Sequence, residues 1–194
     1  MKLRMLTLGD YQTNCYLVSD SAGNTAVIDP GYEPQTILAC LREEKLRPCA
    51  ILLTHGHFDH VGAVRDLAAD TGCQVWLCAE DLALPTNLTA GPLCYTNTYA
   101  EGTTLHLAGL DISVLQTPGH TPGSVCLLTE NTLFSGDTLF AGSCGRTDLP
   151  GGSWEQMRSS LKRLSEIEAN LWVLPGHGES TMLESEKKYN PYLH

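Results

Sequence analysis

Residues 49–60 read CAILLTHGHFDH, an apolar, strand-like run followed at once by a cluster of polar side chains. The cluster places four groups able to bind a metal ion within six residues: His55, His57, Asp59 and His60. Imidazole nitrogen and carboxylate oxygen are ligands that zinc, iron and manganese take from proteins. The rigid end of a buried strand can hold such ligands in a fixed geometry. The stretch therefore predicts a metal site at the end of a strand.

Three polar residues farther along the chain repeat this arrangement. They lie in TPGHTPG, SGDT and PGHG, and are His120, Asp137 and His177. Each follows a strand-like run and sits among glycines or prolines, as expected when loops at one edge of a sheet converge on a site. One such histidine alone is often a hydrogen-bonded loop residue without a further role, whereas all of them together favour a shared metal centre.

Outward from these motifs, short apolar runs alternate with turn-forming residues and helix-like segments. The segment 81–98, with weak periodicity, is expected to be short helix and loop and is a candidate lid. Two sets of strands, each followed by helices, predict two packed sheets with helices outside. Strands are expected at 2–8, 14–19, 25–29, 49–53, 73–77, 103–107, 110–116, 124–129, 131–135 and 171–174, and helices at 34–45, 59–69, 154–169 and shortly before 190.

Composition narrows the class of protein. The 194 residues, 42% hydrophobic and 18% charged, are expected to form one domain over residues 1–194. The net charge of -10 argues against a nucleic-acid partner, because such binding rests on Lys and Arg that displace phosphate counterions. No apolar run reaches the length of a signal-peptide core or a membrane span, so we expect a cytoplasmic protein without a membrane partner. The eight cysteines form no CxxC pair, so we expect free, buried thiols.

The HxHxDH pattern at 55–60, together with the later histidines and aspartate, resembles that of the metallo-β-lactamase superfamily, and these motifs span nearly the whole chain. The resemblance implies an αββα sandwich, that is, two mixed β-sheets flanked by helices, with two divalent metal ions at one edge. Zinc is the first expectation, with iron or manganese as alternatives, since His and Asp accept all three. The implied ligands are, for the first ion, His55, His57 and His120; for the second, Asp59, His60 and His177; and, bridging both, Asp137.

The string GDTLFAGSCGRTD at 136–148 is similar to the glyoxalase II group, the hydroxyacylglutathione hydrolases and their short bacterial relatives. TNCY at 13–16 and NPY at 190–192 are similar to that group too. The β-lactamases of the superfamily usually carry a cysteine where Asp137 falls and often lack an equivalent of His60, so antibiotic hydrolysis is not the first expectation. Long glyoxalase II enzymes add a helical domain with basic contacts to glutathione, and in these 194 residues we expect no such domain. The resemblance implies thioester chemistry and leaves the thiol carrier open.

Three residues receive individual predictions. Asp59 is expected to bind the second ion and to orient the attacking hydroxide, which makes it the predicted catalytic residue. Arg146 lies in a loop bounded by glycines and is predicted to bind a substrate carboxylate, as a basic residue does in the resembling enzymes; an ion pair with Asp148 is the alternative. Cys144 has no activating base nearby and is expected to be structural.

Three more polar residues lie outside the ligand set. Asp29 closes the apolar run 25–29 and either supports the metal-ligand loop or caps a turn or helix. His106 lies in an apolar strand-like run and His194 is the last residue, so neither is expected to bind a metal ion.

The predicted function is a two-metal hydrolase that cleaves hydroxyacyl thioesters, such as S-lactoylglutathione, with a metal-bound hydroxide. One alternative is a persulfide dioxygenase, whose relatives share a similar GRTD string and use a single iron held by two histidines and one aspartate. A lactonase or phosphodiesterase on the same scaffold is another, since fold does not fix substrate. A non-catalytic binding protein would be expected to have lost ligands. The expected partner is a small-molecule thioester, and the oligomeric state stays open.

Overall fold

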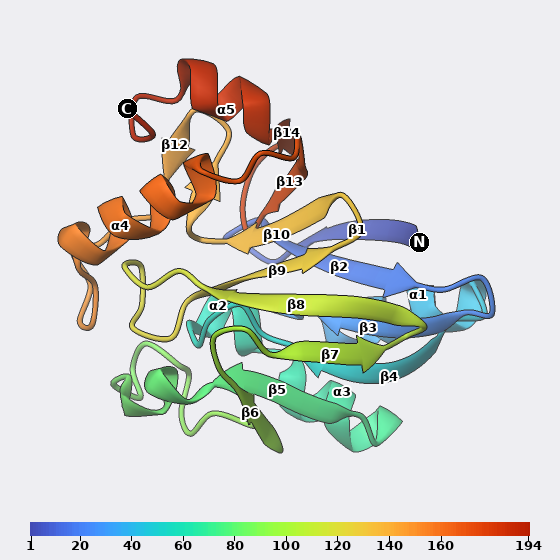
Figure 1. Ribbon diagram of the computed structural model, residues 1–194. Helices are drawn as coiled ribbons and strands as arrows, with labels where there is room; N and C mark the ends of the chain where they lie inside the picture. The colour runs from blue at the N-terminus through green and yellow to red at the C-terminus, as the bar shows by residue number, and fades with distance from the viewer.

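The computed structural model describes residues 1–194 and contains two six-stranded sheets packed face to face (Figure 1). The first sheet has the order β1-β2-β3-β4-β5-β6, formed by β1 (Lys2–Leu8), β2 (Thr13–Ser19), β3 (Asn24–Ile28), β4 (Arg47–Leu52), β5 (Gln74–Cys78) and β6 (Asn97–Tyr99). The second has the order β14-β13-β10-β9-β8-β7, formed by β7 (Thr104–Leu107), β8 (Leu110–Gln116), β9 (Val125–Thr129), β10 (Thr132–Gly136), β13 (Trp172–Pro175) and β14 (Thr181–Met182). Both sheets are mixed: β3 to β6 run parallel, as do β10 and β13, and the other neighbours pair antiparallel.

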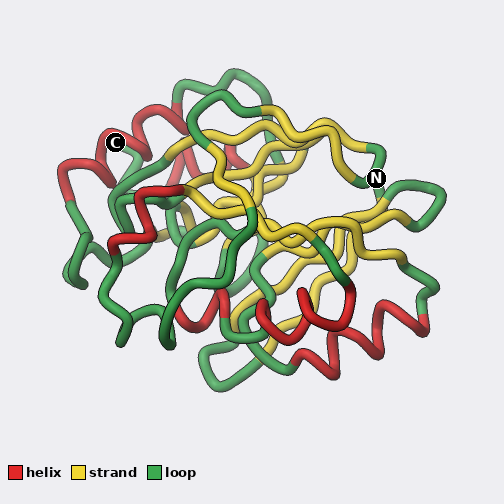
Figure 2. Tube along the Cα trace, turned by 90° about the horizontal axis from the view of Figure 1, so that it is seen from below, coloured by secondary structure: helices red, strands yellow, loops and turns green.

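Helices cover the outer face of each sheet. The helices of the chain are α1 (Pro34–Glu43), α2 (Phe58–Val61), α3 (Val64–Thr71), α4 (Trp154–Ser165), α5 (Leu183–Tyr189) and a 3-10 helix, η1 (Ala79–Ala83). The buried side chains of α1 and α3 pack on the first sheet, and those of α4 and α5 on the second. Seen from below, the strands lie between two groups of helices (Figure 2). The predicted αββα sandwich is confirmed, and no helix combines the length and apolarity needed to cross a membrane.

The central strands are apolar because both of their faces are covered. All seven residues of β2 are buried. Tyr16 and Val18 point into the core between the sheets, whereas Cys15 and Leu17 point into the core beneath α1 and α3. Successive residues of a strand face opposite sides, so a strand covered on both sides reads as a continuous apolar run.

The helix predicted at 59–69 is wrong in one respect, because the chain forms two helices, α2 and α3, there. The break has a cause outside the segment. The N–H of Ala63 donates to the carbonyl of Pro30 at 3.0 Å rather than continuing the helix. A Cβ on Gly62 would lie 2.3 Å from the carbonyl oxygen of Gly31, so the loop after β3 packs directly against the break. A distant segment thus ends α2 one turn after it begins.

The other elements follow the predictions, except for short ones that were missed. These are β6, β14 and a small hairpin of β11 (Leu139–Phe140) and β12 (Ser143–Cys144). All eight cysteines are free, as predicted, but only four of them are buried: Cys15, Cys73, Cys78 and Cys126. Cys49 is exposed.

Loops from both sheets meet at one edge of the sandwich, where α2 lies (Figure 1). The N–H of Val125, at the start of β9, donates to the carbonyl of Thr54, just after β4, at 2.9 Å. The N–H of Asn14 donates to the carbonyl of Gly176, just after β13, at 2.8 Å. These bonds connect the sheets at the place where the motif residues follow their strands.

Candidate metal centre

The structure brings all seven predicted ligands together. Five of them are buried, and Asp137 and His177 are half-buried. Their ligand atoms lie within 4.8 Å of one another in three groups: His55, His57 and His120; His55, His60 and Asp137; and Asp59, His60 and His177. The first and last groups have the same members as the two ligand sets that the resemblance implies.

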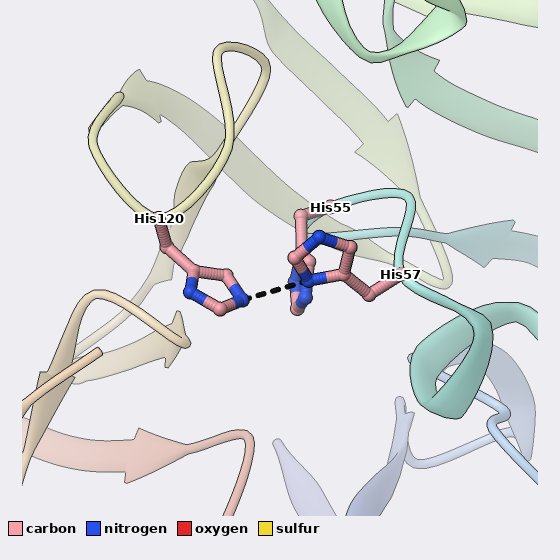
Figure 3. Close-up of side chains that lie close together, drawn as sticks. All are labelled: His55, His57 and His120. Carbon is pink, nitrogen blue, oxygen red and sulfur yellow. Dashed lines mark hydrogen bonds between the residues drawn. The ribbon is translucent and has the colours of Figure 1, made fainter. Parts of the chain in front are cut away.

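The first group consists of three imidazoles that face one another (Figure 3). His55 and His57 come from the loop after β4, and His120 comes from the loop between β8 and β9. Nδ1 of His57 lies 2.8 Å from Nε2 of His120, and the ring centroids of His55 and His120 are 4.8 Å apart. Nitrogen atoms from two loops thus converge on one point.

Three of the histidines are fixed from behind by a hydrogen bond from Nδ1. His120 donates to the carbonyl of Arg146 at 2.8 Å, His177 to the carbonyl of Tyr11 at 3.0 Å, and His60 to the carboxylate of Asp29 at 3.0 Å. Such a bond fixes the tautomer and the orientation of a ligating imidazole. With Nδ1 used in this way, Nε2 is the atom of each ring that faces the cluster.

Asp29 supports the ligand loop, as one of its two sequence interpretations predicted. One carboxylate oxygen accepts the N–H of Thr54 at 2.7 Å, and the other accepts the hydroxyl of Thr54 at 2.6 Å as well as Nδ1 of His60. Oγ1 of Thr54 lies 3.2 Å from Nδ1 of His55. Thr54 therefore joins Asp29 to a second ligand, a contact that the sequence analysis missed because a threonine beside the motif has no distinctive pattern.

Unpaired polar atoms show that the cluster fits a metal ion. Nε2 of His55 and Oδ1 of Asp137 are buried without a hydrogen-bond partner. Burying such atoms unpaired is unfavourable, and native proteins rarely leave them so. Both atoms belong to residues of the middle group, which connects the other two. Coordination of a cation would satisfy them, and the His and Asp donor set suits zinc, iron or manganese.

The local electrostatics differ between the two halves of the cluster. Burial, together with the neighbouring histidines, lowers the pKa of His55 well below its ordinary value and that of His57 to about 4, so both rings are neutral ligands at neutral pH. Burial acts in the same direction on His60, but Asp137 and Asp29 outweigh it and raise its pKa to about 9. Burial would raise the pKa of Asp59, but the hydrogen bond from His177 and the charge of His60 lower it to about 2. The second half is therefore rich in ionised carboxylate, which favours a cation.

A cavity of about 660 Å³ opens onto the cluster. Its apolar wall includes Tyr11, Phe58 and Leu88, and the rings of Tyr11 and Phe58 meet edge to face at 5.1 Å. Leu88 comes from the predicted lid segment, and its carbonyl accepts the N–H of Phe58 at 2.8 Å. The mobility of that segment stays a prediction. The β11–β12 hairpin and the loop after it supply a second part of the wall, the hairpin wall, through Phe140, Ser143, Cys144, Arg146 and Leu149.

The ion pair with Asp148, which was the alternative prediction for Arg146, is confirmed. Arg146 lines the cavity, and it also pairs with Asp148 through two contacts of 2.7 Å. Both side chains of the pair are well exposed. A contact between Arg146 and a substrate stays a prediction.

The remaining candidates lie where the sequence predicted. Cys144 borders the cavity, but burial raises the pKa of its thiol, so it is not an activated nucleophile. His106 is exposed and pairs with Asp111 at 2.6 Å, and neither it nor His194 belongs to the ligand groups.

Comparison with known proteins supports the family that the sequence motifs resemble, and the matched residues include all seven predicted ligands. A family model described as Metallo-beta-lactamase superfamily matches residues 8–177. The chain is 34% identical over 210 aligned positions to the hydroxyacylglutathione hydrolase GloC of Haemophilus influenzae. The alignment covers 100% of this chain and 98% of that protein.

Three crystal structures share the fold over nearly the whole chain. The B3 metallo-beta-lactamase BLEG-1 is 35% identical, with a TM-score of 0.91 and 99% of both chains covered. TTHA1623 in a di-iron-bound form is 40% identical, with a TM-score of 0.89 and coverage of 98% of this chain and 100% of that one. ETHE1 from Myxococcus xanthus is 30% identical, with a TM-score of 0.88 and coverage of 98% and 84%.

Proposed function

Because this chain belongs to the metallo-β-lactamase superfamily, we propose that it is a two-metal thioesterase that cleaves hydroxyacyl thioesters of small thiols. The observation that carries the proposal is the convergence of all seven ligands beside a single cavity. The similarity to GloC, described as a hydroxyacylglutathione hydrolase, supports the choice of substrate class. The free cysteines fit a reducing compartment such as the cytoplasm, and a small-molecule thioester is the proposed partner.

The first ion would be held by His55, His57 and His120, the second by Asp59, His60 and His177, and Asp137 would contact both. When bound, two such ions lower the pKa of a shared water toward neutrality and polarise a carbonyl oxygen. Zinc is the proposed metal, and the similarity to a di-iron-bound protein makes iron the alternative.

Asp59 is the proposed catalytic residue of the chain itself. Its Oδ2 lies 3.2 Å from Nε2 of His177 and 3.8 Å from Nε2 of His60, and the residue lines the cavity. With a pKa of about 2 the carboxylate stays ionised and can only accept hydrogen bonds. It can therefore hold the nucleophilic water by one of its protons and aim the oxygen at the substrate carbonyl.

The cavity walls would orient the substrate. Phe58 and Leu88 give an apolar surface for the acyl chain and the carrier. Arg146 would bind a carboxylate of the carrier, in competition with Asp148. Because a thiolate is a good leaving group, cleavage does not require a separate general acid.

The test is the metal content of a preparation that is assayed at the same time for thiol release from S-D-lactoylglutathione, with Asp137→Ala as the inactive control. About two ions per chain and activity lost in the control are expected. A nitrocefin assay must run beside it, because BLEG-1 is described as a B3 metallo-beta-lactamase. Preferential cleavage of nitrocefin, or one iron per chain with oxygen consumed on a persulfide, would contradict the proposal.

A further inference from the structure

Asp81 is a fully buried carboxylate on η1 that the proposed reaction does not use. It accepts three hydrogen bonds: from the N–H of Gly56 at 2.7 Å, from the N–H of Gly123 at 2.7 Å and from the hydroxyl of Thr121 at 3.0 Å. No lysine or arginine pairs with it. Since every partner is a donor, the site is built for an ionised acceptor, whose burial is unfavourable unless something compensates for it.

The partners of Asp81 lie in two loops that supply ligands to the same group. Gly56 lies between His55 and His57, and Thr121 and Gly123 follow His120 closely. Asp81 thus joins the loop after β4 to the loop between β8 and β9. None of its hydrogen bonds reaches a residue of the Asp59, His60 and His177 group.

Both loops are shaped around this carboxylate. A Cβ on Gly123 would lie 2.7 Å from Oδ1 of Asp81, and a Cβ on Gly56 would lie 3.4 Å from Cβ of Asp81. A larger residue at Gly123 would therefore displace Asp81. The close approach of the Gly123 N–H to Oδ1 depends on that space.

We propose that Asp81 is the positioning residue of the first metal site: it holds the His55, His57 and His120 group in geometry and adds a negative charge behind it. Asp29, which bonds to Thr54 and His60, supports the cluster from the other side. Asp81 thus contacts only the loops of the first group, whereas Asp29 bonds directly to His60 of the second group and reaches His55 through Thr54. The inference rests on the two-ion site of the proposed function but not on its substrate.

The sharpest variant is Asp81→Asn, which keeps the side-chain volume but turns an amide N–H₂ toward N–H donors. Removing the hydrogen-bond partners that orient ligands typically weakens metal affinity about 10- to 100-fold. We expect that loss for the first ion only, so that chelator competition with elemental analysis gives about one ion per chain where the wild type holds about two. The visible spectrum of the cobalt-loaded variant should match that of His55→Ala, which lacks a ligand of the same group.

Asp66→Asn is the matched control, because Asp66 is exposed on α3 and takes part in no side-chain hydrogen bond or ion pair. It removes the same charge and should bind metal as the wild type does. Thr121→Val removes one of the three donors and should weaken the first ion in the same direction, but less. It keeps the test decisive if Asp81→Asn fails to fold.

The melting temperatures of the metal-free and metal-loaded protein separate positioning from simple stability. If Asp81 had only a general structural role, its substitution would lower both melting temperatures equally. If the substitution weakens metal binding, the difference between the metal-loaded and metal-free melting temperatures becomes smaller. The proposal is overturned if Asp81→Asn and Thr121→Val both keep the wild-type melting-temperature difference and the wild-type metal affinity. It is also overturned if both ions bind equally more weakly. A wild type that binds metal but releases no thiol would refute the thioesterase and leave the assignment of Asp81 standing.

Discussion

The metal cluster and the hairpin wall of the cavity are built in different ways. The cluster residues follow central strands, and five of the seven are buried. The wall comes from the two-residue strands β11 and β12 and the loop beyond them, where the side chain of Arg146 is 60% exposed. The buried ligands, which Asp29 and Asp81 support, are held in a fixed geometry, whereas exposed side chains of the wall can adjust to the substrate. We therefore expect substitutions in the cluster to change metal content and rate, and substitutions in the wall to change KM.

The wall is nevertheless anchored, by the end of α5. Glu186 accepts the N–H of Gly142 at 2.8 Å, and Nδ2 of Asn190 donates to the carbonyl of Ser143 at 3.0 Å and to Glu186 at 2.8 Å. Both residues are buried. The NPY string near the end of the sequence thus has a structural role, because its asparagine holds the hairpin.

The largest effect is expected for Asp59→Asn. The amide keeps the shape but carries no charge, so the second ion loses an anionic ligand and the water keeps only a weaker, neutral acceptor. Changes behind a ligand already reduce metal affinity or activity about 10- to 100-fold, and this change in the ligand itself should reduce kcat by more than about 100-fold. Steady-state kinetics at saturating zinc test it. A kcat within a few-fold of the wild type would remove Asp59 from the mechanism.

Asp29→Asn should have the next largest effect and should mirror Asp81→Asn. An amide has one acceptor oxygen where the carboxylate has two, so the donors of Thr54 and His60 can no longer all be accepted, and the second ion should bind about 10- to 100-fold more weakly. Chelator competition measures this affinity. If the first ion is lost instead, the two carboxylates do not support separate halves of the cluster.

Glu186→Gln tests the wall. Loss of the charged acceptor for Gly142 should loosen the hairpin and raise KM about tenfold, which corresponds to about 1.4 kcal/mol, while kcat and metal content stay at wild-type values. Glu184→Gln, an exposed position on the same helix, is the control. A fall in metal content in Glu186→Gln would show that the wall and the cluster are not independent.

Asp148→Asn should have a smaller effect, because exposed ion pairs are weak. It frees the guanidinium of Arg146, so KM for a thioester that carries a carboxylate should fall less than about fivefold. Arg146 lowers the pKa of Asp148 to about 2, so the pair is complete above the ordinary value of about 3.9 and is lost only as the pH falls toward 2. The change in KM should thus be the same from about pH 5 to about pH 8. A marked pH dependence in that range would point to another group.

Cys144→Ser should have the smallest effect. The thiol lines the cavity, but burial raises its pKa and so disfavours a thiolate, and kcat/KM should fall less than about threefold. Loss of all activity with intact metal content would instead make this cysteine a nucleophile.

Elements that depend on patterns within a few residues could be predicted from the sequence. The strands β1, β2 and β3 lie within one residue of their predicted bounds, because apolar runs between turn residues carry that information locally. The break between α2 and α3 could not be predicted from the sequence, because it depends on the hydrogen bond from the N–H of Ala63 to the carbonyl of Pro30. The strands of two or three residues were missed because they are too short to show a periodicity.

The sequence by itself determined the identity of the seven candidate ligands and their place at the ends of strands, since both follow from residue type and from neighbours along the chain. Only the tertiary structure decided which side chains support them. Asp81 reaches Gly123 across 42 residues, and Asn190 reaches Ser143 across 47. No local propensity encodes such contacts, because they exist only after the two sheets have packed and brought their loops to one edge.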